Sequence, residues 1–114
     1  MKLVEPGDKV HIIDRRMFEG DVRRHFIGEV MDANEVAMIV RGFVFVYDGA
    51  QNEYSRRDTP RTRLISLTGA GQIINLLPRA ADIEAARYAD VDGRLTVTDG
   101  ESFSLDINEF GSRR

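Results

Sequence analysis

The sequence predicts an all-β fold, a small barrel or β-sandwich of about eight short, mostly antiparallel strands with hairpin connections. Residues 36–47 are the most apolar stretch and are rich in β-branched and aromatic residues, which suit a pleated sheet better than a helix. This stretch is predicted to be one long central strand, or two strands folded at Arg41-Gly42. Turn-forming residues separate further short apolar runs along the chain, as in a sandwich or barrel.

Two strands are expected before this apolar stretch. Residues 5–8 form a turn signal, because Pro presets one backbone dihedral and Gly allows a positive φ. The first strand is expected at 9–13 and the second at 26–31. The polar segment 14–25 between them is predicted to be a loop.

Shorter strands are expected after the apolar stretch. Residues 53–57 are predicted to return as a polar strand. Its charges suit the edge of a sheet, where they discourage pairing with other chains. The glycine-containing segment 68–71 is predicted to join 63–67 and 72–77 as a hairpin.

The C-terminal third contains the clearest hairpin signals. Asp92-Gly93 and Asp99-Gly100 bracket the alternating segment 94–98, and Asp-Gly between alternating segments is the strongest short-range mark of a hairpin. The Ala-rich segment 79–89 has two interpretations, a strand or at most one short helix. The Asp92-Gly93 turn that follows favours the strand.

The beginning of the chain resembles the opening of small Src-homology-type barrels and KOW motifs. The resemblance is carried by Pro6-Gly7-Asp8 before the first strand, by Gly20, and by Gly28-Glu29-Val30 in the second strand. The pattern of these proteins is a Gly-Asp turn, a strand, and a second strand with Gly-x-Val. The resemblance covers residues 6–31 and implies a barrel, although segment 14–25 is longer and more charged than in a KOW motif.

Composition places the chain among ordinary globular proteins. Its 114 residues are 42% hydrophobic and 31% charged, so we expect residues 1–114 to form a single β-rich domain with its own core. The longest apolar stretch is too short for a membrane-spanning helix, and no signal-peptide core is evident. Cysteine is missing from the sequence, which excludes disulfides and thiolate metal sites. We expect a cytoplasmic protein without membrane contact.

The sequence contains no clear catalytic motif. His11 and His25 could hold a metal with a carboxylate, but their spacing is not that of a ligand pair. His11 occupies the polar-facing position of its strand and His25 ends the predicted loop, so both are expected at the surface. Nucleophile-elbow, P-loop and calcium-loop patterns are missing. We therefore predict no catalytic residue, no metal, no cofactor and no small-molecule substrate.

Arginine-rich segments are the best candidates for a binding site. Guanidinium groups bind phosphates and carboxylates, and aromatic residues lie beside both segments. Acidic residues interspersed among them would neutralise much of this charge. The candidate residues for an anion, nucleic acid or acidic partner are Arg15, Arg16, Arg23, Arg24, Arg56, Arg57, Arg61 and Arg63.

Three functional classes remain, in decreasing order of preference. The first is a non-catalytic protein-interaction or self-assembly module. The chain has more apolar strands than one small barrel needs, so some sheet edge must be covered by a partner or a second copy. The second is an RNA or single-stranded nucleic-acid binding barrel that uses the Arg-rich loops, although the net charge of −3 disfavours a general nucleic-acid coat. An enzyme is the least favoured class.

Overall fold

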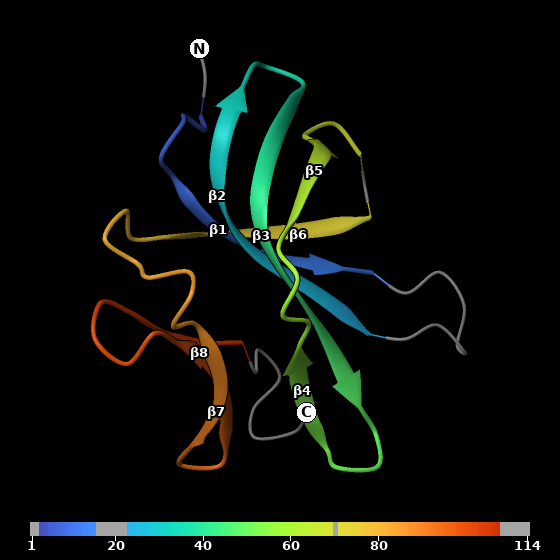
Figure 1. Cartoon of the computed structure of the whole chain (residues 1–114), viewed down its shortest axis with the longest axis vertical. Coiled ribbons are helices and arrows are strands. Elements are labelled where there is room, and N and C mark those ends of the chain that lie inside the picture. The colour runs from blue at the N-terminus through green and yellow to red at the C-terminus, as the bar shows by residue number, and fades with distance from the viewer. Residues whose placement is uncertain (1–2, 16–22, 70, 108–114) are drawn as a thin grey trace.

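The computed structural model describes residues 3–15, 23–69 and 71–107 (Figure 1). These residues contain nine strands and no helix. Every strand pair among them is antiparallel. The all-β prediction is therefore confirmed.

The strands form two separate sheets. The large sheet contains β1 (Lys9–Asp14), β2 (Arg24–Ala33), β3 (Ala37–Asp48), β4 (Glu53–Arg56), β5 (Arg61–Ser66) and β6 (Gln72–Leu77). Its order is β4-β3-β2-β1-β6, and β5 also pairs with β3. The small sheet contains β7 (Arg87–Val91), β8 (Arg94–Thr98) and β9 (Ser104–Asp106), in that order. Figure 1 shows the small sheet beside the lower half of the large one.

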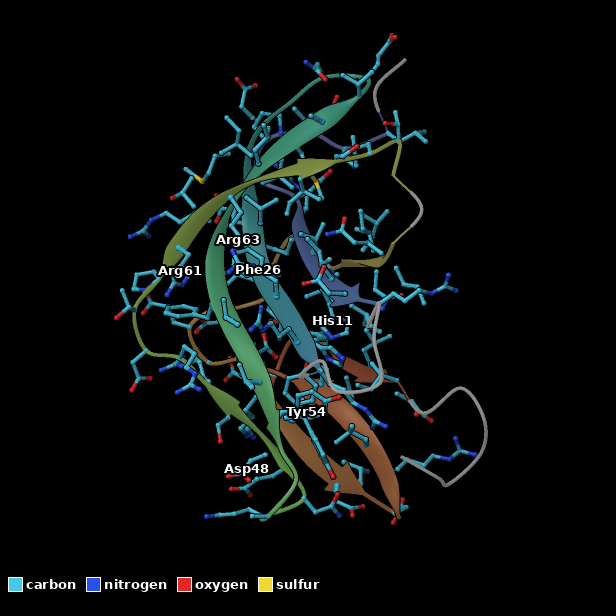
Figure 2. All side chains as sticks on the ribbon, turned by 90° about the vertical axis from the view of Figure 1, so that its right-hand side faces the viewer. His11, Phe26, Asp48, Tyr54, Arg61 and Arg63 are labelled. Carbon is cyan, nitrogen blue, oxygen red and sulfur yellow. The ribbon has the colours of Figure 1, made fainter. Side chains whose placement is uncertain are left out.

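β5 and β6 do not form the predicted hairpin with each other. β5 pairs with the first half of β3, because β4 covers only the second half, and β6 pairs with the free edge of β1. Both pairings join strands that are distant in sequence. A local turn signal cannot predict such pairings. Figure 2 shows that β2 and β3 curve strongly, but within the described residues the large sheet does not close into the barrel that the resemblance implies.

Segment 79–89 is neither a continuous strand nor a helix. Only its last residues belong to β7, and the preceding ones form turns. Asp82 Oδ1 accepts the backbone N–H groups of residues 84 and 85, and Ala86 is buried between the sheets. Side-chain hydrogen bonds to the backbone thus replace the helical ones.

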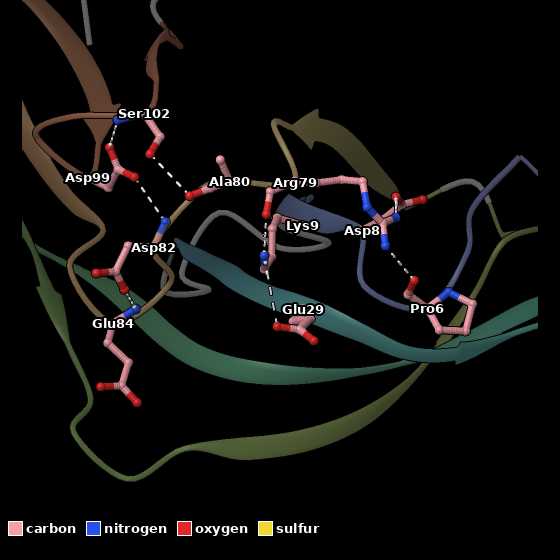
Figure 3. A network of polar contacts seen from close by, with 10 residues as sticks. All are labelled: Pro6, Asp8, Lys9, Glu29, Arg79, Ala80, Asp82, Glu84, Asp99 and Ser102. Atoms are coloured by element: carbon pink, nitrogen blue, oxygen red, sulfur yellow. Dashed lines mark hydrogen bonds and ion pairs between the residues drawn. The ribbon is translucent and has the colours of Figure 1, made fainter.

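The two Asp-Gly hairpins are confirmed. Asp92 and Gly93 have φ values of 53° and 79°, and a turn with two positive φ values matches the twist of the flanking strands. At the β8–β9 turn, the carboxylate of Asp99 accepts backbone N–H groups (Figure 3). These hydrogen bonds, that from Asp82 above all, hold the pKa of Asp99 well below its usual range. The donors are residues 82, 101, 102 and 103.

Two separate apolar clusters stabilise the fold. The inner core lies within the curve of the large sheet and contains Val4, Val10, Ile12, Phe26, Val30, Ala33, Met38, Val40, Val44 and Ile65. The intersheet core lies between the two sheets and contains Ile27, Phe45, Leu77, Ala81, Ala86 and Val97. Because side chains alternate along a strand, β2 and β3 contribute to both cores from their opposite faces.

A glycine pair allows β2 and β3 to approach closely where the sheet curves. Gly28 and Gly42 are directly opposite each other. A Cβ atom on Gly42 would collide with the carbonyl oxygen of Ile27 and with Cα of Gly28. Neither contact involves a flexible side chain that could move away, so glycine is required at this position.

We predict that Gly42→Ala lowers the free energy of unfolding by about 1–3 kcal/mol, because the added methyl group forces the two strands apart. Gly71→Ala is the matched control: a Cβ at Gly71 meets no atom within 4 Å. Urea denaturation of both variants measures the difference. Equal midpoints for the two variants would contradict the role of the glycine pair.

Candidate functional site

A buried polar cluster lies between the two sheets. His11 on β1 and His25 on β2 are 0% and 6% exposed, so the prediction that both lie at the surface is wrong. His25 is also part of β2 and not of a loop. Both rings project from the outer face of the large sheet, the face opposite the inner core, and Tyr88 of β7 contacts both of them from the small sheet.

A chain of hydrogen bonds connects these side chains. Tyr88 Oη lies 3.0 Å from His11 Nε2 and 2.5 Å from His25 Nδ1. On the other side of His11, Asn75 Nδ2 of β6 lies 3.1 Å from Nδ1. An amide nitrogen only donates, so with this amide orientation His11 Nδ1 accepts and Nε2 carries the proton. His11 then donates to the Tyr88 hydroxyl, which donates to His25 Nδ1.

Aromatic packing encloses this hydrogen-bond chain. Tyr54 of β4 stacks on His25 and on Tyr88, with ring centroids 4.6 Å apart in both pairs. Phe45 lies 5.1 Å from the ring of Tyr88, measured between centroids. Four strands of the large sheet and one of the small sheet therefore meet at these rings, although no backbone hydrogen bond joins the two sheets among the described strands.

Burial keeps the cluster neutral. Desolvation lowers the pKa of His11 from 6.5 to about 4 and, together with the positive charges of His11 and Arg23, lowers the pKa of His25 to about 3. The same desolvation raises the pKa of Tyr88 well above 10. At neutral pH both imidazoles and the phenol are uncharged, as the hydrogen-bond chain requires.

The chemistry of this cluster is that of a structural junction. Among the described residues, the hydrogen-bond partners of the histidines are an amide and a phenol, not the carboxylate that the metal hypothesis requires. In the part of the chain that the structure describes, no group of three His, Cys, Asp or Glu side chains is placed to hold a metal ion.

The predicted arginine site is divided between the two faces of the large sheet. Arg24, Arg61 and Arg63 share the face of Phe26, as their cross-strand registers show. The guanidinium of Arg63 lies 5.2 Å from the centroid of the Phe26 ring (Figure 2). Because Phe26 is 1% exposed, this ring is covered and offers no stacking surface to a base.

The remaining arginines do not join this group. Arg23 and Arg56 lie over the rings of Tyr47 and Phe43, at 5.5 and 4.7 Å from the centroids. Both rings belong to the outer face, so these two arginines lie on the other side of the sheet. Arg15 and Arg57 are exposed beyond strand ends, and Arg16 lies outside the described residues.

Among the described strands β6 is an edge strand, which the sequence prediction missed because it paired this segment with β5. Its residues Gln72–Leu77 include no charge and no proline. Ile73 and Leu76 are 51% and 63% exposed and point to opposite faces of the sheet. The absence of charge was visible in the sequence, but the free edge depends on a long-range pairing with β1.

A groove of about 470 Å³ lies between the outer face of β2–β3 and the turns before β7. Cationic and anionic side chains both line it, so its charge selects no class of ligand. The charged lining residues are Lys9, Arg41, Glu29, Asp82 and Glu84, and Figure 3 shows that Lys9 is already engaged by Glu29 and by the carbonyl of Arg79.

Comparison of the chain with protein-family models, curated proteins and solved structures finds no match. No helix long and apolar enough to cross a membrane occurs in residues 3–15, 23–69 and 71–107.

We predict that Tyr88→Phe lowers the free energy of unfolding by about 1–3 kcal/mol, because it leaves a donor on His11 and an acceptor on His25 unpaired while the ring remains. Tyr47→Phe is the matched control, since the Tyr47 hydroxyl donates to Asn52 at an exposed site. Thermal or urea unfolding at pH 7.5 compares the two. A Tyr88→Phe variant no less stable than the control would contradict the hydrogen-bond chain.

Proposed function

We propose that the protein functions by protein–protein association and that its partner at the free edge of β6 is a second copy of the same chain. The observation that carries this proposal is the exposed, uncharged and apolar character of this edge. An edge strand presents unpaired backbone N–H and C=O groups, and natural proteins protect such edges with charges, proline or a covering segment.

The other edges of the described strands carry the usual protection. β4 contains Glu53 and Arg56, and β5 contains Arg61 and Arg63. In the small sheet, β9 has only three residues and includes Asp106, and β7 includes charged residues at both Arg87 and Asp90. β6 alone among these edge strands lacks a charge, which singles it out as the strand with a pairing role.

The composition of β6 suits pairing with itself. Two copies related by a two-fold axis would place β6 antiparallel to β6 of the partner and extend the large sheet across the interface. No like charges meet in such a pair, and the partner strand would cover Ile73 on one face and Leu76 on the other. An extended segment of a different protein could also pair with this edge strand, through the same backbone groups.

We predict that the wild-type protein is a dimer by size-exclusion chromatography with light scattering. Replacing both Ile73 and Leu76 by Lys should give a monomer that remains folded, because both side chains are already exposed and charges oppose edge pairing. Leu64→Lys is the matched control, since Leu64 is 74% exposed on β5 and should leave the dimer intact. A wild-type monomer at high concentration would refute self-association.

One observation favours nucleic-acid binding as a second candidate function. Arg24 and Arg61 lie exposed on one face of the large sheet, and no ion pair is recorded for either within the described residues. Unpaired guanidinium groups on one face can neutralise phosphates. Against this candidate, the covered ring of Phe26 removes the aromatic platform that single strands usually require.

We expect weak or undetectable binding of a fluorescent oligouridylate at low salt. If binding is found, nucleic-acid recognition requires that it weaken steeply as salt rises and that it fall in the Arg24→Ala, Arg61→Ala double variant. Arg56→Ala, on the opposite face, serves as the control. Tight binding with both properties would place nucleic-acid binding ahead of self-association.

A further inference from the structure

The small sheet is attached to the large one in a way that permits its separate release. The inner core is built from residues of the large sheet and of the segment before β1. No residue of β7, β8 or β9 belongs to it. The small sheet is held by the intersheet core and by the histidine–tyrosine cluster. Local opening in proteins follows such cooperative units.

The histidines lie at the centre of this attachment, and none of the described acidic side chains is hydrogen-bonded to them. Their partners, Asn75 and Tyr88, are neutral, and the rings of His11 and His25 lie 5.2 Å apart between centroids. Two imidazolium ions at this distance would repel each other inside a desolvated interface. With an additional proton on each ring, the Tyr88 hydroxyl would face two donors and could give its own proton to neither.

Among the described residues, no carboxylate is hydrogen-bonded to either imidazole, and Asp90, on the same face of β7 as Tyr88, is exposed. Lys9 and Glu29, on the faces of β1 and β2 that carry the rings, interact with each other at 4.0 Å, and Arg56 is paired with Asp58. The charge acting on His25 from outside the cluster is that of Arg23, which is positive. The titratable and charged groups on the described elements that face the rings are Lys9, Arg23, Glu29, Arg41, Tyr47, Tyr54, Arg56, Tyr88 and Asp90.

We propose that protonation of His11 and His25 releases the β7–β9 sheet from the outer face of the large sheet, while the large sheet stays folded around its inner core. Release would uncover Ile27 and Phe45, which are now 0% and 2% exposed. Mild acid would therefore convert a covered sheet face into an exposed apolar surface.

The direction of the pH dependence follows from the two protonation states. In the open form the histidines titrate near 6.5, whereas in the closed form they stay neutral down to about 4 for His11 and about 3 for His25. The open form thus binds more protons throughout this range, and closure weakens as pH falls from 6.5. Each histidine raises the open-to-closed ratio by up to about tenfold per pH unit.

Hydrogen exchange with mass spectrometry, corrected for the intrinsic pH dependence of exchange, tests the release. Between pH 7.5 and pH 5.0 we expect protection of β8 amides to fall by at least about tenfold, from the linkage relation. Protection of β1 and β2 should persist, and binding of an apolar dye should rise. Unchanged protection of β8, or equal loss in β1 and β2, would overturn the proposal.

The His11→Gln, His25→Gln double variant separates titration from general acid sensitivity. Glutamine retains hydrogen-bonding capacity but takes up no proton, so β8 protection in this variant should be the same at both pH values. A variant that loses protection like the wild type would overturn the proposal. If the double variant does not fold, the wild-type exchange pattern across β8, β1 and β2 still decides the outcome.

Discussion

The fold depends on one constraint: β2 and β3 carry large apolar side chains on both faces, and both faces must be shielded from water. Phe26 and Val44 point to one face, whereas Ile27 and Phe45 point to the other. A flat two-stranded ribbon cannot shield both. The protein shields the first face by curving the large sheet over itself, which the Gly28–Gly42 approach permits, and the second by adding the small sheet.

The two cores that shield these faces differ in chemistry. The inner core is apolar, so its stability depends on packing and changes little with pH. The intersheet core contains two histidines and a tyrosine whose hydrogen bonds are satisfied when all three side chains are neutral. A fully paired polar network specifies how the two sheets dock, because any shifted docking would leave buried donors or acceptors unpaired. The same property makes docking sensitive to protons.

Much of the fold was predictable from local sequence, because alternation and turn chemistry are local signals. The bounds of β6 were predicted to the residue, and the Asp92-Gly93 turn correctly placed a hairpin. The partner of β6 was not predictable, since pairing with β1 is a long-range choice. The prediction for segment 79–89 was wrong because its alanines are compatible with both strand and helix. The carboxylate of Asp82 accepts backbone N–H groups two and three residues later, which stabilises turns instead.

The candidate site was predicted less well than the fold. His11 alternates with Val10 and Ile12, which suggested a solvent-facing position until Tyr88 from a distant strand covered it. One signal could have indicated the burial of His25: Phe26 and Ile27 follow it directly, and consecutive apolar residues, as in residues 43–46 of β3, are typical of strands covered on both faces. The arginines were separated for the same geometric reason, since alternate positions on one strand project to opposite faces.

The protonation state of the buried rings is the most direct test of this account. Nitrogen chemical shifts of the two histidines, measured by NMR at pH 7.5 and followed to pH 5.5, report both tautomer and charge. At pH 7.5 the account predicts two neutral rings that carry their proton on Nε2 and accept at Nδ1. Rings that titrate near pH 6.5 while the β8 amides stay protected, or a proton on Nδ1 of either histidine at pH 7.5, would contradict it.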